Sequence, residues 1–222
     1  GDRIPMTDNV KIMFENEQLD NASPATVSRC GIIYVSAVDL DWLTVTQAWL
    51  KSRPDDETEV LEPLFSHYIG NCTPEDTGEA FSYIIRKMNP VMKTSRIGQV
   101  TGLFNLLTGL LADAALNRDQ DFEIKLERLF LYCFIWTVGG VLEPGCRAKM
   151  SSYLEERIAD GRPEGLLPEL QAGETYYEYY VDLFSLEWKK WKPDIWEYPK
   201  TGGDEQLDFS NLLVPTMDST RA

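Results

Sequence analysis

The sequence predicts a mainly α-helical fold with short β segments near its two ends. Apolar residues recur at helical spacing from Asp39 to about Ile158, the pattern of helices that each bury one face. Residues 122–136 are apolar almost all round, as in a helix at the centre of a bundle. Isolated β-rich runs at residues 30–35 and 209–216 lie outside this helical region. We therefore expect a bundle of five or six helices, whose terminal β segments belong to flanking α/β cores.

The first forty residues have the pattern of the end of an α/β core. A short helical face is expected from Val10, Met13 and Phe14. Ser23 followed by Pro24 is a helix N-cap with proline at the first helical position, which predicts a short helix over Ala25 to Ser28. The apolar run 30–35 then predicts a strand buried on both faces. Because no comparable strand follows, we expect a fragment with the rest of that sheet upstream.

The helices of the bundle are expected in the following order. Their ranges are 42–50, 55–69, 81–88, 97–111, 122–136 and 144–158. The second begins after Pro54 with three acidic residues, which suit the positive end of a helix dipole. The third ends before Pro90, and Pro144 begins the last. After a Gly- and Pro-rich loop at 160–173, residues 176–181 predict a strand or hairpin arm.

Composition limits the function. The 222 residues carry 36 acidic and 21 basic side chains, a formal net charge of -15, which argues against nucleic acid or an anionic membrane as the main partner. The single His67 excludes most zinc sites and triads that need a second imidazole. Four widely spaced cysteines predict reduced thiols. No GxxxxGK[ST] phosphate loop is present, so an autonomous nucleotide hydrolase is not expected.

The most informative residue is Arg29, at the junction between the short helix and the β run. A guanidinium at the rim of a sheet can project toward a neighbouring module. From the residues alone, however, a salt bridge at the rim or a cap on the helix C-terminus is the favoured interpretation.

Several motifs in the right order resemble the dynein heavy chain family of AAA+ motors. The run from Asp20 to Gly31 resembles the signature in the second AAA+ module, and residues 134–140 resemble a helix end of the family. Trp188 and Trp191 resemble its paired tryptophans, and residues 214–221 resemble the opening of the third module. Residues 40–54 lean toward axonemal outer-arm heavy chains.

The resemblance implies a domain organisation: 1–38 as the end of the second module's core, 39–192 as its helical lid, and 193–222 as a linker and the start of the third module. It implies that Arg29 is an arginine finger acting in trans on ATP held by the first module. Arg96 is the candidate nucleotide sensor of the lid, although a plain surface arginine is the more common interpretation. Val214, Pro215 and Thr216 would line the adenine pocket of the third module.

The resemblance also implies ATP or ADP with Mg²⁺ as cofactor, bound mainly by residues outside this chain, so the chain alone should be inactive. The implied partners are the neighbouring AAA+ modules, other dynein subunits and, through distant parts of the heavy chain, the microtubule. The implied location is the cytoskeleton of a cilium or flagellum. The alternative is a non-enzymatic acidic helical protein-interaction module. A carboxylate-based metal enzyme is disfavoured because no His cluster is present.

Overall fold

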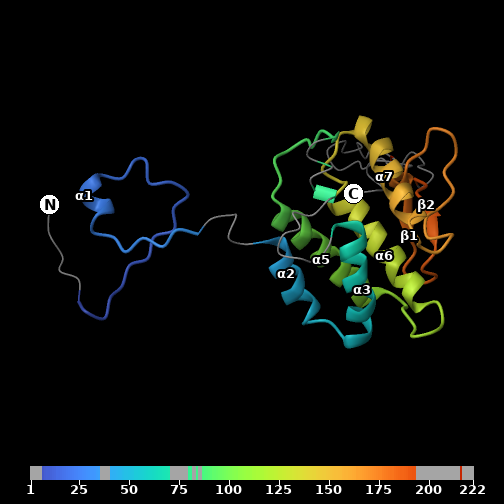
Figure 1. Ribbon diagram of the computed structural model, residues 1–222, viewed down its shortest axis with the longest axis horizontal. Helices are drawn as coiled ribbons and strands as arrows, with labels where there is room; N and C mark the ends of the chain where they lie inside the picture. Colours follow the sequence, from blue (N-terminus) through green and yellow to red (C-terminus); the bar gives the residue numbers. More distant parts are fainter. Residues whose placement is uncertain are drawn as a thin grey trace, which may run out of the picture. The chain divides into compact units, whose positions relative to one another are not determined.

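The computed structural model describes residues 7–35, 41–70, 80, 81, 84, 87–193 and 216. Its contacts divide the chain into two compact units, Gly1–Asp39 and Leu40–Ala222, and each is described by itself. In its described residues the first unit contains a short helix, and the second contains a helical bundle with a small β-hairpin (Figure 1). The mainly α fold class is therefore confirmed.

In the first unit, helix α1 (Pro24–Val27) begins where the sequence predicts it. The Thr26 amide donates to the Ser23 hydroxyl at 3.1 Å, which satisfies a backbone donor that the helix itself leaves free. The predicted helical face around Met13 is wrong. Residues 7–14 contain no helix, and Met13 is 97% exposed. With nothing to pack against, three apolar side chains cannot offset the cost of ordering a helix this short.

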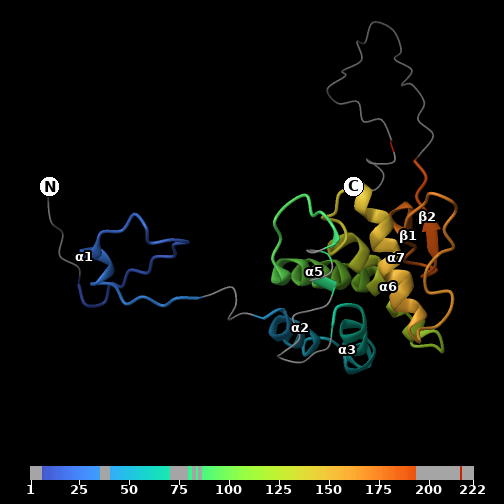
Figure 2. The same cartoon turned by 45° about the horizontal axis from the view of Figure 1, so that its top comes forward.

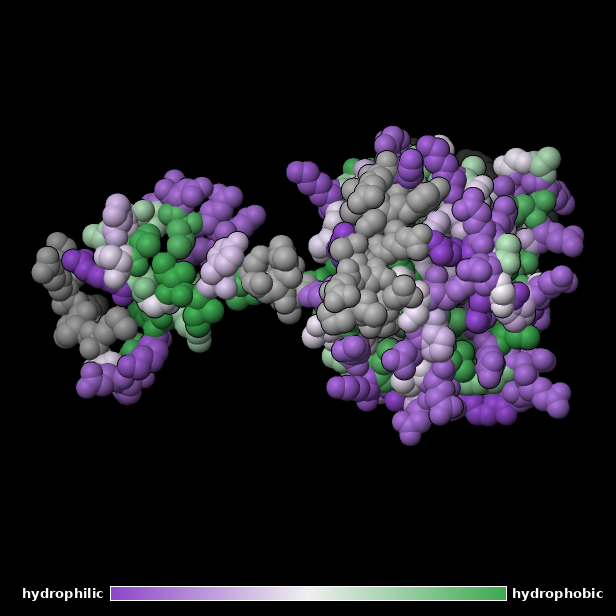
Figure 3. Space-filling model, in the orientation of Figure 1, coloured by the Kyte–Doolittle hydropathy of each residue, from purple (hydrophilic) through white to green (hydrophobic). Residues whose placement is uncertain are grey.

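The predicted buried strand at residues 30–35 is also wrong for the described part of the chain. Residues 31–35 form no strand, and Ile33 is 88% exposed. A strand is held by backbone hydrogen bonds to a neighbouring strand, and the described residues of the first unit contain none. Residues 32–35 are instead exposed hydrophobic residues of this unit. The hydrophobic surface of the first unit is green in Figure 3.

Five of the six predicted helices of the second unit are confirmed along their length. They are α2 (Trp42–Leu50), α3 (Asp55–Tyr68), α5 (Arg96–Asp113), α6 (Phe122–Thr137) and α7 (Arg147–Ala159). A 3-10 turn, η1 (Pro144–Cys146), leads into α7, as Pro144 suggested. Of the predicted helix at 81–88, residues 81, 84 and 87 are described and helical.

Helix α6 is the centre of the bundle. It contacts α3, α5 and the hairpin region, while α2 packs on α5 and α7 packs on α3. Figure 2 shows α2 and α3 on one side of the α5–α6 pair, with α7 and the hairpin toward the other. Leu126, Phe130 and Phe134 on α6 are fully buried. The unbroken apolar run at residues 129–136 of this helix thus reflects neighbours on several faces.

After α7 the chain forms an irregular loop, as predicted for 160–173. A 3-10 turn, η2 (Tyr176–Glu178), leads into strand β1 (Tyr179–Val181), which pairs antiparallel with β2 (Trp188–Lys190). The hairpin arm predicted over residues 176–181 is confirmed at residues 179–181, with Tyr180 opposite Lys189. Of the β segment predicted at 209–216, residues 209–215 lie outside the described residues.

The end of α6 and the hairpin region meet at Gly139. The Tyr177 hydroxyl donates to the Gly139 carbonyl at 2.8 Å, and both groups are buried. A Cβ atom built on Gly139 would overlap the Tyr177 hydroxyl and the Ile135 carbonyl. Glycine is therefore required at this position by a close approach of backbone and side chain.

Gly139→Ala should destabilise the second unit by about 2 kcal/mol, since the added methyl group forces Tyr177 or the helix end to move. Gly109→Ala is the matched control, because nothing lies within 4 Å of a Cβ at Gly109 inside α5. That change should stabilise by roughly 0.5–1 kcal/mol through helix propensity. Urea unfolding followed by circular dichroism measures both, and equal effects of the two substitutions would contradict the steric argument.

Candidate functional site

Arg29 follows α1 on an exposed corner of the first unit. Its amide donates to the Thr26 carbonyl at 3.2 Å, and the Ser23 and Thr26 hydroxyls are 2.8 Å apart. The Ser28 hydroxyl donates to the Ala25 carbonyl at 3.2 Å. These hydrogen bonds fix the backbone just before Arg29. Within residues 7–35, the Arg29 guanidinium forms neither an ion pair nor a hydrogen bond, so no described carboxylate neutralises it.

Arg96 is the first residue of α5 and is half-buried. Ser95 caps the helix by accepting from the Gly98 amide at 3.0 Å. A helix N-terminus carries a partial positive charge and favours anions, so the dipole disfavours a cation here. No described carboxylate forms an ion pair with Arg96. This end of α5 therefore combines two sources of positive potential.

The remaining predicted site residues give less information. Val214 and Pro215 lie outside the described residues, and Thr216 is exposed. Arg29 belongs to the first unit, whereas Arg96 and Thr216 belong to the second. These residues are thus described in separate surroundings, and their roles stay predictions.

The second unit contains a buried charged network that the sequence analysis missed. Glu127 on α6 is 1% exposed, and its carboxylate accepts two hydrogen bonds from Arg162, one of them at 2.7 Å from Nε to Oε1. The Tyr68 hydroxyl donates to the same carboxylate at 2.6 Å, and the Tyr153 hydroxyl donates to the Tyr68 carbonyl at 2.8 Å. Burial, and next the hydrogen bond to Glu127, raise the pKa of Tyr68.

This network connects α3, α6, α7 and the loop after α7. Its signal in the sequence is weak, because the segment 122–136 contains two glutamates, Glu123 and Glu127, and the sequence does not show which of them is buried. A carboxylate on the buried side of a central helix needs a cationic partner. The sequence does not indicate which cation supplies it, because Arg162 is 35 residues away.

Comparison with known proteins identifies this arrangement of helices and hairpin. The family described as the dynein heavy chain AAA lid domain matches residues 61–193. The chain belongs to the dynein heavy chain family. The match includes the whole of the buried network and the hairpin of this dynein lid.

Curated dynein heavy chains align with the whole of this chain. The flagellar outer arm gamma chain of Chlamydomonas reinhardtii is 37% identical, dynein axonemal heavy chain 8 of Homo sapiens 33%, and dynein axonemal heavy chain 5 of Rattus norvegicus 35%. The alignments cover 100% of this chain but 5%, 5% and 6% of those proteins. This dynein chain thus spans about a twentieth of the length of the relatives it matches.

The described part of this dynein chain contains no group of three or more His, Cys, Asp or Glu residues that could hold a metal ion. No described helix is both long and apolar enough to cross a membrane. Cys30 is an exposed free thiol, and Cys133 and Cys146 are buried free thiols, whereas Cys72 lies outside the described residues. Burial raises the pKa of the Cys133 thiol.

The hairpin of the dynein lid is attached to the preceding loop by Glu174. Its carboxylate accepts from the Lys190 ammonium, from the Tyr179 hydroxyl at 2.7 Å and from the Gln171 amide at 3.2 Å. The hydrogen bond from Lys190, followed by those from Tyr179 and Gln171, lowers the pKa of Glu174 from 4.5 to about 2. Three donors thus favour the ionised carboxylate in the folded lid.

Glu174→Gln should lower the thermal midpoint of the lid at neutral pH, and this difference from the parent chain should shrink in acid. Because the folded pKa of about 2 lies below the ordinary value of 4.5, the stabilisation is complete above pH 4.5 and is lost as the pH falls toward 2. Thermal melts of both chains at pH 7, 4.5 and 3 measure the trend. A difference that stays constant over this range would show that the charge of Glu174 contributes nothing.

Proposed function

We propose that this chain is part of the motor ring of an axonemal dynein heavy chain. Residues 1–38 would end the core of the second AAA+ module, residues 39–192 would form its helical lid, and residues 193–222 would lead into the third module. The order of the motifs, the lid match and the axonemal relatives support this assignment. The same findings favour it over an acidic interaction module without enzymatic context.

The observation that carries the functional proposal is the surroundings of Arg29. An exposed guanidinium, held at a hydrogen-bonded corner with no described carboxylate beside it, is available to an anion from another module. A guanidinium binds phosphate oxygens through a planar set of donors. We therefore assign Arg29 as an arginine finger that acts on ATP held by the first module.

The chemistry of this assignment is the stabilisation of charge during phosphoryl transfer. ATP with Mg²⁺ supplies the transferred phosphoryl group, and negative charge spreads over its equatorial oxygens. Arg29 would place its donors against those oxygens, and the bonds at Ser23, Thr26 and Ser28 would orient the backbone from which it extends. The phosphate loop and the Mg²⁺ ligands would come from residues outside this chain.

The lid would transmit the nucleotide state as one body. Its helices share one hydrophobic core that runs from α2 to the hairpin, which suits rigid-body movement. Arg96 would sense the nucleotide of the second module, because it adds a cation to an anion-favouring helix end. Val214, Pro215 and Thr216 would line the adenine pocket of the third module.

The whole heavy chain would use this ring for ATP-driven movement along microtubules in a cilium or flagellum, together with other dynein subunits. The experiment that tests the proposal is replacement of Arg29 in the full-length heavy chain, followed by measurement of microtubule-stimulated ATP turnover. Normal turnover would contradict it.

A further inference from the structure

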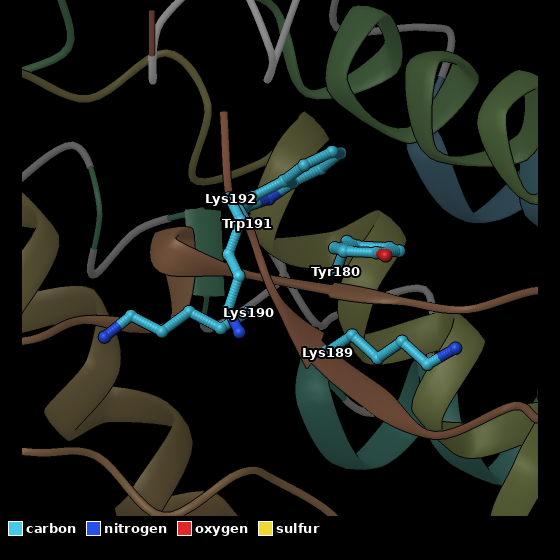
Figure 4. Close-up of a pocket in the computed structure, with 5 residues that line it drawn as sticks. All are labelled: Tyr180, Lys189, Lys190, Trp191 and Lys192. Carbon is cyan, nitrogen blue, oxygen red and sulfur yellow. The ribbon is translucent and has the colours of Figure 1, made fainter. Parts of the chain in front are cut away.

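The hairpin of the lid presents an aromatic pair on its outer face. The rings of Tyr180 and Trp191 have centroids 4.4 Å apart at an interplanar angle of 35°. Figure 4 shows both rings on one side of the hairpin, whereas Lys190 points away to the other. The inner residues Tyr179 and Val181 are buried in the lid. The outer pair is therefore not part of the hydrophobic core.

This face lines an open hollow of about 450 Å³ that is rich in hydrogen-bond donors. Its lining residues are Tyr180, Lys189, Lys190, Trp191 and Lys192. Among the described residues, the Tyr180 hydroxyl and the Lys192 ammonium form no hydrogen bond or ion pair, and the Trp191 indole N–H is buried without an acceptor. Trp188, on the inner face, differs: its indole N–H donates to the Leu166 carbonyl at 2.6 Å. Donors on the outer face therefore lack an acceptor, whereas the indole N–H of Trp188 on the inner face has one.

The segment that ends the hairpin has the opposite charge to the whole chain. Residues 188–193 contain three lysines and no acid, in a chain with a net charge of -15. Two of these lysines already bind carboxylates. Lys189 pairs with Asp182 at 2.7 Å, and Lys190 pairs with Glu174. Lys190 points away from the aromatic pair, but the Lys189 ammonium has three donors, so its one carboxylate does not saturate it. The local chemistry therefore matches further carboxylates.

We propose that this hairpin hollow is a docking surface for an extended acidic peptide segment of a partner protein. Carboxylates are acceptor-only groups and would satisfy the donors of Tyr180 and Lys192. The methylene groups of glutamate side chains would lie against the aromatic pair. Alternate side chains of an extended segment are about 7 Å apart, so two carboxylates of one segment can reach different donors of this small surface. The proposal concerns a face of the lid and does not depend on the role of Arg29.

The test uses the full 222-residue chain and a hexaglutamate peptide, with hexaglutamine as the uncharged control. The Trp191 indole N–H signal in the ¹⁵N spectrum, assigned with Trp191→Phe, should shift and saturate with hexaglutamate and not with hexaglutamine. Lys192→Glu should weaken binding by roughly 5- to 10-fold, since it replaces attraction by repulsion at a partly screened site. Because Lys192 has no described partner, this substitution leaves the hairpin intact.

Lys93→Glu is the matched control, because it changes the net charge equally at an exposed site outside the hollow. It should leave the affinity unchanged. An equal loss in both variants would indicate non-specific attraction and overturn the proposal. Tighter binding of inorganic triphosphate than of hexaglutamate would overturn the acidic-peptide assignment in favour of a phosphate site. Absence of a saturable shift at Trp191 would also overturn it.

Discussion

Arg29→Ala in the full-length heavy chain should lower microtubule-stimulated ATP turnover by about 10³- to 10⁵-fold, the range for an arginine finger that is removed. The side chain is exposed and forms no bond with a described residue of its own unit, so its loss removes no described contact that stabilises the fold. The expected loss is therefore in the rate of phosphoryl transfer and not in the amount of folded motor.

Two variants separate the functions of the guanidinium. Arg29→Lys keeps the positive charge but loses the planar arrangement of donors, and it should give an intermediate rate. Lys11→Ala, an exposed cation in the same unit, is the control and should leave turnover unchanged. Thermal unfolding of each motor checks its integrity. If Arg29→Ala reduces turnover no more than Lys11→Ala does, Arg29 is an ordinary surface residue and not an arginine finger.

Arg162→Ala should lower the free energy of unfolding of the lid by about 3 kcal/mol. The substitution leaves the carboxylate of Glu127, 1% exposed, with the Tyr68 hydroxyl as its remaining described donor. A buried charge without its counter-ion is costly because it has lost its hydration. For a unit of this size, that loss corresponds to a fall in the thermal midpoint of roughly 6–12 °C.

Lys125→Ala on the same helix is the matched control. Lys125 pairs with the exposed Asp119 at 2.6 Å, and loss of a surface pair should cost no more than about 1 kcal/mol. Replacing Tyr68, Glu127 and Arg162 together, as Tyr68→Phe, Glu127→Leu and Arg162→Met, should restore most of the stability, since it removes the unpaired charge. Calorimetry distinguishes these variants. A loss in Arg162→Ala as small as in Lys125→Ala would mean that Glu127 reaches solvent.

The sequence predicted local features well where the cause is itself local. Ser23 and Pro24 specify the start of α1 through capping and a fixed backbone angle. Periodic apolar residues place α2, α3, α5, α6 and α7, because each helix satisfies its own backbone hydrogen bonds. The prediction at residues 30–35 was wrong because a strand depends on partners that its own sequence does not contain.

The features of the candidate site were likewise predicted where their cause is local and missed where it depends on distant residues. Arg29 was noticed from its position between a capped helix and a β run, and its role as a finger came from the family resemblance. Glu127 is one of two glutamates in a central helix, and the sequence shows neither that it is the buried one nor that Arg162 pairs with it. The tyrosine, tryptophan and lysines that line the hairpin hollow are visible in the sequence, which gives no sign that they share one surface.

By itself the sequence determined the helical periodicity of this dynein chain, the corner that carries Arg29, and an acidic surface that disfavours nucleic acid. The tertiary structure alone decided that Arg162 neutralises Glu127, that Tyr177 requires glycine at position 139, and that Tyr180 and Trp191 share an outer face. The physical reason is distance. Capping and periodicity act within a few residues along the chain, whereas ion pairs, close packing and donor-rich hollows depend on which distant segments the folded core brings together.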